Sequence, residues 1–226
     1  MDRPELVVII PAYREGMTIG PVVAAALRHA PVIVVDDCSP DDTATRAAAE
    51  GATVVRNEVN SGYEGSLNRG FAKAQEMGFA YAVTLDADGE HDPSLVADFG
   101  RLLTEEKIPL VLGVRARKQR FAEIVMGLYV KLRFGADDIL CGMKGYELRL
   151  VTERGGFDLS RSIGTETAID AMRRGIPFRQ VPVYGCPRQD SPRFDRRFAA
   201  NLRILKALGA IIKRDLRGKD VNVIAR

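Results

Sequence analysis

Four acidic residues crowd into the segment VTLDADGEHDP, which spans residues 83–93 and begins with a short apolar run. Two of them, Asp86 and Asp88, are two residues apart, so in an extended chain both point to the same side. Carboxylates that share a site raise each other's pKa, and a divalent cation removes that conflict. Mg²⁺ and Mn²⁺ favour oxygen ligands, and Mg²⁺ typically takes one or two carboxylates plus substrate phosphates. The segment is a candidate site for a metal-bound diphosphate, although a bare Asp-x-Asp also suits an ordinary solvated loop.

The elements that would position these carboxylates alternate between β-branched runs and helical stretches. Strands are predicted at residues 6–10, 32–35, 53–55, 81–85 and 110–114, and helices at 18–29, 41–50, 65–77 and 93–105. The last of these helices has Asp92 as its N-cap and Pro93 in its first turn. Such alternation is typical of an α/β fold with a mostly parallel, doubly wound sheet flanked by helices.

The pattern becomes less regular after residue 115. The sequence predicts a helix at 118–134, a short strand pair or ribbon at 139–150, a helix at 165–174, a strand at 178–184 and a long basic helix at 196–214. No Pro-, Gly- or Ser-rich linker separates the two halves, so we expect a single domain over residues 1–226.

Composition narrows the class of protein. The chain has 226 residues, 46% of them hydrophobic, and a formal net charge of +3, which gives no case for broad nucleic-acid binding. Its three cysteines are scattered and odd in number, which favours a reducing, cytoplasmic setting over a disulfide framework. The apolar run at 6–10 is too short for a signal-peptide core. The stretch at 207–212 falls far short of the roughly 20 residues that cross a bilayer, so only contact with a membrane surface stays open.

Ligands of open α/β sheets bind outside the carboxyl ends of the strands. The segments after the first four predicted strands are PAYREG (11–16), DDCSPDDT (36–43), RNEVNSGYEGSLNRG (56–70) and DADGEHDP (86–93). No GxGxxG follows the first strand, which argues against a dinucleotide dehydrogenase, and no GKS or GKT occurs, which excludes a P-loop.

This order of motifs resembles the family 2 glycosyltransferases of the GT-A fold, over roughly residues 5–115. Within that family the chain looks most similar to the polyprenol (dolichol) phosphate mannose synthases. The closer resemblance rests on the DADGEH form, on the NxGxxG loop at 60–65 and on PVYGCPRQDSPR at 182–193. It implies a nucleotide-sugar-binding half at 1–115 and an acceptor half at 116–226.

The resemblance also implies roles for individual residues. The nucleotide-sugar-binding residues would be Pro11, Tyr13, Glu15, Asp36, Asp37, Asn60, Gly62, Gly65, Asp86 and Asp88, with Asp36 in contact with the base. Mg²⁺ or Mn²⁺ would be held by Asp86, Asp88 and Glu90. Glu90 stands where close relatives often carry Gln, and this departure adds negative charge. Each glycine also suits an ordinary turn, and Asp36 also suits a helix cap.

The acceptor depends on whether the chain supplies cations or a base. A phosphate monoester is largely dianionic at neutral pH, so it needs cations more than it needs proton removal. Candidates for that role are Arg115, Arg117, Arg188, Ser191 and Arg193, with Asp88, Arg115 and Arg188 expected to be catalytic. The last three of the phosphate set lie in a shorter version of the R-x-x-G-x-S-[KR] loop of relatives, without its glycine. A solvated basic loop is the alternative.

A hydroxyl acceptor instead needs a general base, and Glu166 is the nearest candidate. The first hypothesis is therefore a metal-dependent, inverting transfer of a hexose, of mannose or glucose type, from a GDP- or UDP-linked donor to a polyprenyl phosphate. The second keeps the fold but uses a saccharide or small-molecule hydroxyl acceptor. The third is a non-catalytic nucleotide-sugar-binding module.

The predicted C-terminal helix bears on location. Its apolar stripe is made by Phe198, Leu202, Leu205, Leu208 and Ile212, among many Lys and Arg residues. A basic amphipathic helix of this kind suits the cytoplasmic face of a membrane, where the protein would be peripheral. A helix packed on the domain's own sheet, with a solvated basic back, fits equally well.

Overall fold

A seven-stranded sheet forms the centre of the computed structural model, which describes residues 5–116, 121–160, 162–185 and 197–223. The strands are β1 (Leu6–Ala12), β2 (Val32–Asp36), β3 (Thr53–Arg56), β4 (Tyr81–Thr84), β5 (Leu110–Arg115), β6 (Lys144–Glu147) and β7 (Phe178–Val183). Their order across the sheet is β3-β2-β1-β4-β6-β5-β7. All neighbours run parallel except β6, which is antiparallel to both β4 and β5. The predicted mostly parallel α/β sheet is confirmed.

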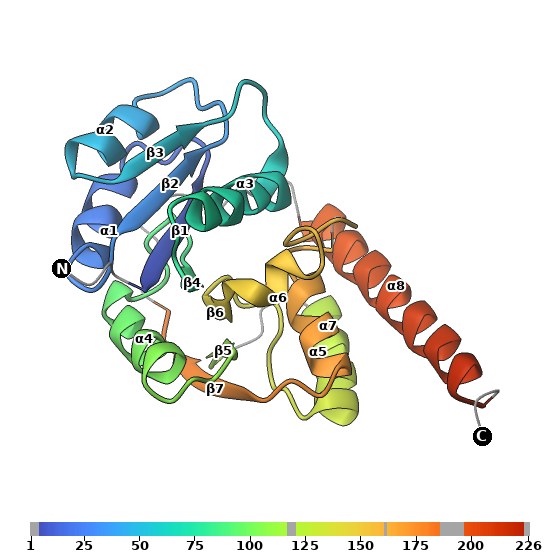
Figure 1. Cartoon of the computed structure of the whole chain (residues 1–226). Coiled ribbons are helices and arrows are strands. Elements are labelled where there is room, and N and C mark those ends of the chain that lie inside the picture. The colour runs from blue at the N-terminus through green and yellow to red at the C-terminus, as the bar shows by residue number, and fades with distance from the viewer. Residues whose placement is uncertain (1–4, 117–120, 161, 186–196, 224–226) are drawn as a thin grey trace.

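Helices cover both faces of this sheet (Figure 1). They are α1 (Ile19–Ala26), α2 (Thr43–Ala49), α3 (Gly62–Glu76), the 3-10 turn η1 (Pro93–Leu95), α4 (Val96–Thr104), α5 (Phe121–Phe134), α6 (Leu148–Thr152), α7 (Glu166–Arg173) and α8 (Arg197–Val223). One buried cluster joins α1, α2 and α4 to the sheet, and a second joins α3, α5, α6, α7 and α8 to it. The predicted cap is present, since the Asp92 side chain accepts a hydrogen bond from the backbone N–H of Ser94 at 2.9 Å.

The segment 139–150 differs from the predicted strand pair. It supplies one strand, β6, inserted between β4 and β5, and then the short helix α6. Gly145 explains the tight fit of this strand, because a Cβ there would lie 2.9 Å from the Leu103 side chain of α4. A lone strand with a partner on each side leaves no room for a ribbon.

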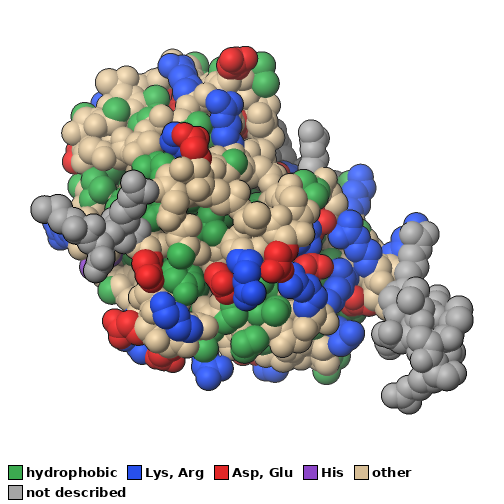
Figure 2. Space-filling model, in the orientation of Figure 1, with side chains coloured by type: hydrophobic (Ala, Val, Ile, Leu, Met, Phe, Trp, Pro, Cys, Tyr) green, Lys and Arg blue, Asp and Glu red, His purple; other side chains and the backbone are tan. Residues whose placement is uncertain are grey.

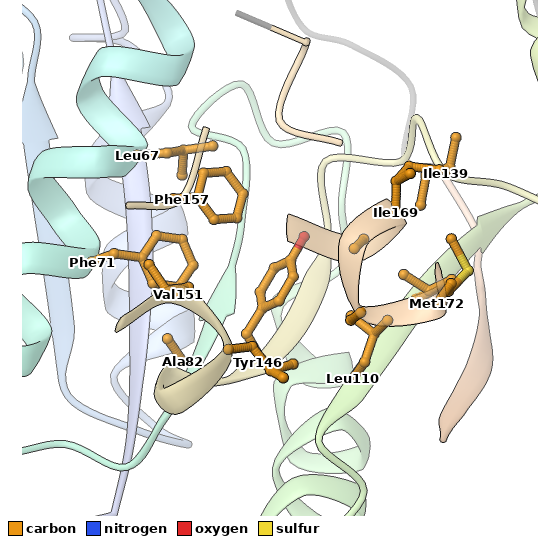
Figure 3. Packing of buried hydrophobic residues seen from close by; sticks show 14 of the residues in the cluster. Leu67, Phe71, Ala82, Leu110, Ile139, Tyr146, Val151, Phe157, Ile169 and Met172 are labelled. Carbon is orange, nitrogen blue, oxygen red and sulfur yellow. The ribbon is translucent and has the colours of Figure 1, made fainter. Parts of the chain in front are cut away.

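An aromatic cluster ties the two halves of the chain together (Figure 3). The Phe71 ring of α3 stacks on that of Phe157, with 4.4 Å between ring centroids. Tyr146 of β6 meets both rings edge-on. This packing fixes α3, whose N-terminus reaches the carboxyl edge of the sheet, against the loop before α7.

Helix α8 packs on α5 through Ile204, Ala207, Leu208 and Ile211, all of them buried. Two ion pairs near its centre join Arg214 to Glu166 at 3.0 Å and Asp215 to Arg173 at 2.5 Å. The predicted stripe on this helix is therefore divided: Leu208 faces inward, whereas Leu202 and Leu205 are exposed. The side chain of Phe198 lies outside the described residues.

Candidate functional site

A cleft of about 690 Å³ lies at the carboxyl ends of β1, β2 and β4, where open α/β sheets bind ligands. Its lining consists of Pro11, Ala12, Tyr13, Glu15, Asp37, Asn60, Gly62, Tyr63, Ser66, Asp86, Ala87, Asp88 and Arg203. Eight of the ten residues predicted for the nucleotide sugar are in this set. The two exceptions are Asp36 and Gly65.

The loop after β1 is held by the loop after β2. The backbone N–H of Arg14 donates to Ser39 Oγ at 3.0 Å, and that of Glu15 donates to Thr43 Oγ1 at 2.9 Å. Asp41 accepts hydrogen bonds from both the N–H and the hydroxyl of Thr43 at the start of α2. These bonds fix the backbone that carries Tyr13 and Glu15 to the cleft.

The adjacent acids Asp36 and Asp37 have different environments. Asp36 is completely buried, and its carboxylate forms an ion pair with Arg56 Nε at 3.2 Å. Asp37 is the one that lines the cleft. The expectation that Asp36 contacts the base does not fit this burial, because Asp36 is the last residue of β2 and points into the protein rather than out of the sheet edge.

Asp37 also fixes the start of α3. Its carboxylate accepts hydrogen bonds from Asn57 Nδ2 at 2.7 Å and from the N–H groups of Ser61 and Gly62 at 2.8 Å each. Gly62 has φ +77°, a left-handed conformation that favours glycine, so its presence at the cleft has a backbone reason. Gly65 serves packing instead, because a Cβ there would lie 2.6 Å from that of Ser61.

Asp86 is surrounded by three other elements. The Tyr63 hydroxyl of α3 donates to Asp86 Oδ1 at 3.4 Å, and His91 Nδ1 lies 3.7 Å from Oδ2. Burial and the charge of Asp86 raise the pKa of Tyr63 well above its usual value, so this hydroxyl stays protonated as a donor. A Cβ at Gly142 would collide with the carboxylate, which shows how closely the backbone beside β6 approaches it.

The donor set at the cleft fits a divalent cation. Asp86 and Asp88 both line it, and two carboxylates are what Mg²⁺ or Mn²⁺ takes when substrate phosphates complete its shell. Glu90, the predicted third ligand, is not among the lining residues. Within the described ranges, no group of three or more His, Cys, Asp and Glu side chains is placed to hold a metal ion by itself.

Arg115, which was predicted to bind the acceptor phosphate, forms ion pairs with acids of the protein. Its guanidinium contacts Asp138 at 2.7 Å and Glu123 at 3.8 Å, and both acids are buried. Burial works against both charges, but the pairing outweighs it, so the pKa of Asp138 is lowered and that of Arg115 raised. Arg115 is thus engaged by two acids of the protein, and its role toward an acceptor phosphate stays a prediction. The other four members of that set, Arg117, Arg188, Ser191 and Arg193, lie outside the described residues.

The predicted base Glu166 begins α7 and does not line the cleft. Its carboxylate accepts hydrogen bonds from the Leu159 and Ser160 N–H groups at 2.8 Å, and it pairs with Arg154 at 2.9 Å and Arg214 at 3.0 Å. Burial opposes its ionisation, but these donors outweigh burial and lower its pKa to about 2. A carboxylate with so low a pKa is a weak base at neutral pH, so the geometry argues against this role.

Five lining residues were not predicted as site residues: Ala12, Tyr63, Ser66, Ala87 and Arg203. Tyr63 and Ser66 belong to the glycine-rich segment 56–70, which was already expected at the cleft. The helical spacing of that segment was the signal that could have indicated these two residues. Arg203 comes from α8, far along the chain, and reaches the cleft beside α3. Nothing in the local sequence around Arg203 distinguishes it from the other basic residues of that helix.

The fold and the carboxylate-lined cleft define a nucleotide-sugar-binding protein of the GT-A type. Residues 7–128 match the Glycosyl transferase family 2 profile, which is more than half of the chain. The chain therefore belongs to glycosyl transferase family 2, as its motifs predicted, and is a glycosyltransferase that takes its sugar from a nucleotide sugar.

The chain is also similar to several individual proteins. An uncharacterized protein of Methanocaldococcus jannaschii is 31% identical over 205 residues, which cover 81% of this chain and 82% of that one. Undecaprenyl-phosphate mannosyltransferase of Micrococcus luteus is 31% identical over 160 residues, 61% of this chain and 64% of that protein, which is less than two thirds of its length. Glucosyl-3-phosphoglycerate synthase of Mycobacterium tuberculosis, solved with Mn²⁺ and UDP-glucose, has a TM-score of 0.75 at 26% identity, over 92% of this chain and 79% of that one.

Proposed function

We propose that this glycosyltransferase moves a hexose, of mannose or glucose type, from a UDP- or GDP-linked donor to a polyprenyl phosphate, with inversion, at the cytoplasmic face of a membrane. The observation that carries the proposal is the placement of its acids. Asp86 and Asp88 line the cleft, whereas the candidate base Glu166 is held elsewhere by arginines. This division suits a metal-assisted departure of a diphosphate and an acceptor that needs no deprotonation.

The donor side rests on Asp86 and Asp88 as the residues that would hold Mg²⁺ or Mn²⁺. A divalent cation there would neutralise charge that develops on the departing diphosphate. The chain's own contribution is to fix these carboxylates. Tyr63 and His91 lie against Asp86, and the Asp88 side chain accepts a hydrogen bond from the Glu90 N–H at 3.1 Å.

The proposed acceptor follows from the ion pairs of Glu166, which make it a poor candidate for a general base. A hydroxyl acceptor requires a base near the attacking oxygen, and losing one typically costs about 10²–10⁴-fold in rate. A lipid phosphate is already largely dianionic at neutral pH and attacks without proton removal. The name of the Micrococcus relative, an undecaprenyl-phosphate mannosyltransferase, supports a polyprenyl phosphate.

An exposed apolar face on α5 supports a membrane location. Its members are spaced three or four residues apart, which puts them on one side of a helix: Phe121 is 74% exposed, Ile124 53%, Leu128 58% and Leu132 80%. Leu202 and Leu205 of the neighbouring α8 are also exposed, and Figure 2 shows Lys and Arg side chains gathered over α7 and the near part of α8. An apolar helix face beside basic groups suits the surface of an anionic bilayer. In the part of the chain that the structure describes, no helix has the length and apolarity to span one.

The activity is tested with the purified chain, Mn²⁺ or EDTA, and a panel of UDP- and GDP-sugars offered with phytanyl phosphate, phosphoglyceric acid or simple saccharides. We expect metal-dependent transfer to phytanyl phosphate. Transfer only to saccharides or to phosphoglyceric acid would replace the lipid phosphate with another acceptor. Nucleotide-sugar binding without transfer to any acceptor would favour the non-catalytic module.

The membrane location is tested by flotation with liposomes that contain anionic lipid. Replacing Leu128 and Leu132 by Asp should abolish flotation, because two charges would enter the apolar face. Val59→Asp is the matched control, since Val59 is 69% exposed and lies in the loop before α3, away from α5. Equal flotation of all three proteins would exclude α5 as the contact.

A further inference from the structure

The cleft is strongly acidic and has one described cation. Four carboxylates line it, those of Glu15, Asp37, Asp86 and Asp88, against the single guanidinium of Arg203 among the described lining residues. A diphosphate carries several negative charges of its own. A divalent cation at Asp86 and Asp88 offsets part of this excess, and a phosphate oxygen away from that ion still needs a donor with positive charge.

Arg203 belongs to the C-terminal helix α8 and forms an ion pair with Glu64, and the two side chains differ in exposure. Its Nη2 lies 3.0 Å from Glu64 Oε1, and the same oxygen accepts the Ile163 N–H at 3.2 Å. The Glu64 side chain is 8% exposed, whereas that of Arg203 is 61% exposed. Glu64 is therefore fixed by the body of the protein, and Arg203 is the partner that can move.

We propose, on the basis of the function above, that Arg203 binds a phosphate group in this cleft and that Glu64 holds its guanidinium there until the phosphate arrives. The fork of an arginine matches two phosphate oxygens as well as it matches a carboxylate. The Arg203 end of this ion pair is largely exposed, and Glu64 keeps its hydrogen bond from the Ile163 N–H when the guanidinium turns to phosphate, which limits the cost of the exchange. The phosphate belongs either to the donor diphosphate or to the acceptor.

This exchange links the cleft to the C-terminal helix. α8 is fixed at its centre by the pairs of Arg214 with Glu166 and of Asp215 with Arg173, and it packs on α5, which carries the exposed apolar face. Arg203 lies near the start of α8, ten residues after Arg193 in the sequence. A phosphate that engages Arg203 thus binds the end of α8 that faces the cleft.

Two substitutions separate a phosphate ligand from a structural ion pair. Arg203→Ala removes the donor, so the affinity for phosphate should fall by about 10- to 100-fold, the usual effect of losing a charged hydrogen bond. Glu64→Gln keeps an oxygen for the Ile163 N–H but removes the competing charge, so affinity should rise. A purely structural pair predicts loss in both variants.

Arg46→Ala is the matched control. Arg46 has a similar exposure to Arg203, pairs with the exposed Asp42 at the start of α2, and does not line the cleft. Its affinity for nucleotide should equal that of the wild type. Arg203→Lys is a further test, because lysine keeps the charge but lacks the planar fork of arginine. Its affinity for phosphate should lie between those of the wild type and Arg203→Ala.

The two sources of phosphate are separated by calorimetric titration of UDP and GDP with Mn²⁺, without acceptor, and by the KM for phytanyl phosphate at saturating donor. Opposite shifts of Arg203→Ala and Glu64→Gln in the first measurement assign Arg203 to the donor, and opposite shifts in the second assign it to the acceptor. Shifts of the same sign, or none in either measurement, overturn the proposal while leaving the family function intact. A wild-type chain that binds neither nucleotide and transfers no sugar overturns both.

Discussion

Asp86 in the cleft and Glu166 beneath α8 are both acids at the start of a loop or helix, but the protein treats their charges differently. Glu166 receives two backbone N–H groups, the Ser160 hydroxyl and two arginines, all within 3.0 Å. Asp86 has a tyrosine hydroxyl at 3.4 Å and a histidine nitrogen at 3.7 Å. Within the described ranges, no Lys or Arg lies within ion-pair distance of it. The protein neutralises the charge of Glu166, which therefore stabilises the fold. The charge of Asp86 faces the cleft, where it suits a bound cation.

The largest expected effect on activity is at the cleft, where Asp88 lies beside Asp86. Asp88→Asn keeps the shape of the side chain and removes its charge, so metal-dependent transfer should fall by about 10²–10³-fold, as for the loss of a group that stabilises developing charge. The melting temperature should stay close to that of the wild type. Full activity in the variant, or wild-type activity that is unchanged in excess EDTA, would contradict the metal role.

A smaller effect is expected from a change that moves Asp86 without altering its chemistry. A methyl group at Gly142 would collide with the Asp86 carboxylate, so Gly142→Ala must displace one of them. A misplacement of about 1 Å at a reacting centre costs about 10²-fold, which is the loss of turnover we expect.

Gly209→Ala is the matched control for Gly142→Ala, because a Cβ there meets nothing within 4 Å and its helical backbone suits alanine. Turnover should be unchanged in this control. A Gly142→Ala enzyme with wild-type turnover and the same Mn²⁺ requirement would show that the position of Asp86 is not limiting.

The sequence was sufficient for the parallel strands of the sheet and for most of the cleft, because both depend on local patterns. Strand ends and the DxD spacing placed Asp86 and Asp88 correctly at the carboxyl edge. At 139–150 the predicted strand pair or ribbon is instead the single antiparallel strand β6, whose place between β4 and β5 depends on tertiary contacts. The ion pairs of Arg115 with Asp138 and of Arg203 with Glu64 also join residues far apart in the sequence, so no local pattern predicts them.

Adjacent or similar acids are the hardest to assign from sequence. Asp36 and Asp37 both follow a buried strand, and only the direction of each side chain distinguishes the buried one from the one in the cleft. Glu166 was the nearest candidate in the acceptor half for the base that a hydroxyl acceptor needs. Its arginine partners come from positions 154 and 214, which no local motif connects to it.

The smallest expected effect on activity, and a clear one on stability, is at Glu166. Glu166→Gln leaves Arg154 and Arg214 without their shared countercharge, so the free energy of unfolding at neutral pH should fall by roughly 2–3 kcal/mol. Turnover of the folded enzyme should stay within a few-fold of the wild type, because no step requires this carboxylate as a base. A loss of 10²-fold or more with an unchanged melting temperature would restore Glu166 as the base and favour a hydroxyl acceptor.

The pH dependence of stability gives a second test at the same residue. Hydrogen bonds and ion pairs lower the pKa of Glu166 from 4.5 to about 2 despite its burial, so its stabilisation is complete above pH 4.5 and is lost as the pH falls toward 2. Burial, together with the charge of Glu166, raises the pKa of the nearby Asp158, which titrates in the opposite sense and offsets part of the loss. The difference in unfolding free energy between the wild type and Glu166→Gln, measured by urea titration from pH 6 to pH 2.5, should therefore shrink as the pH falls. A difference that stays constant over this range would mean that Glu166 gains nothing from its arginines, and the contrast with Asp86 would disappear.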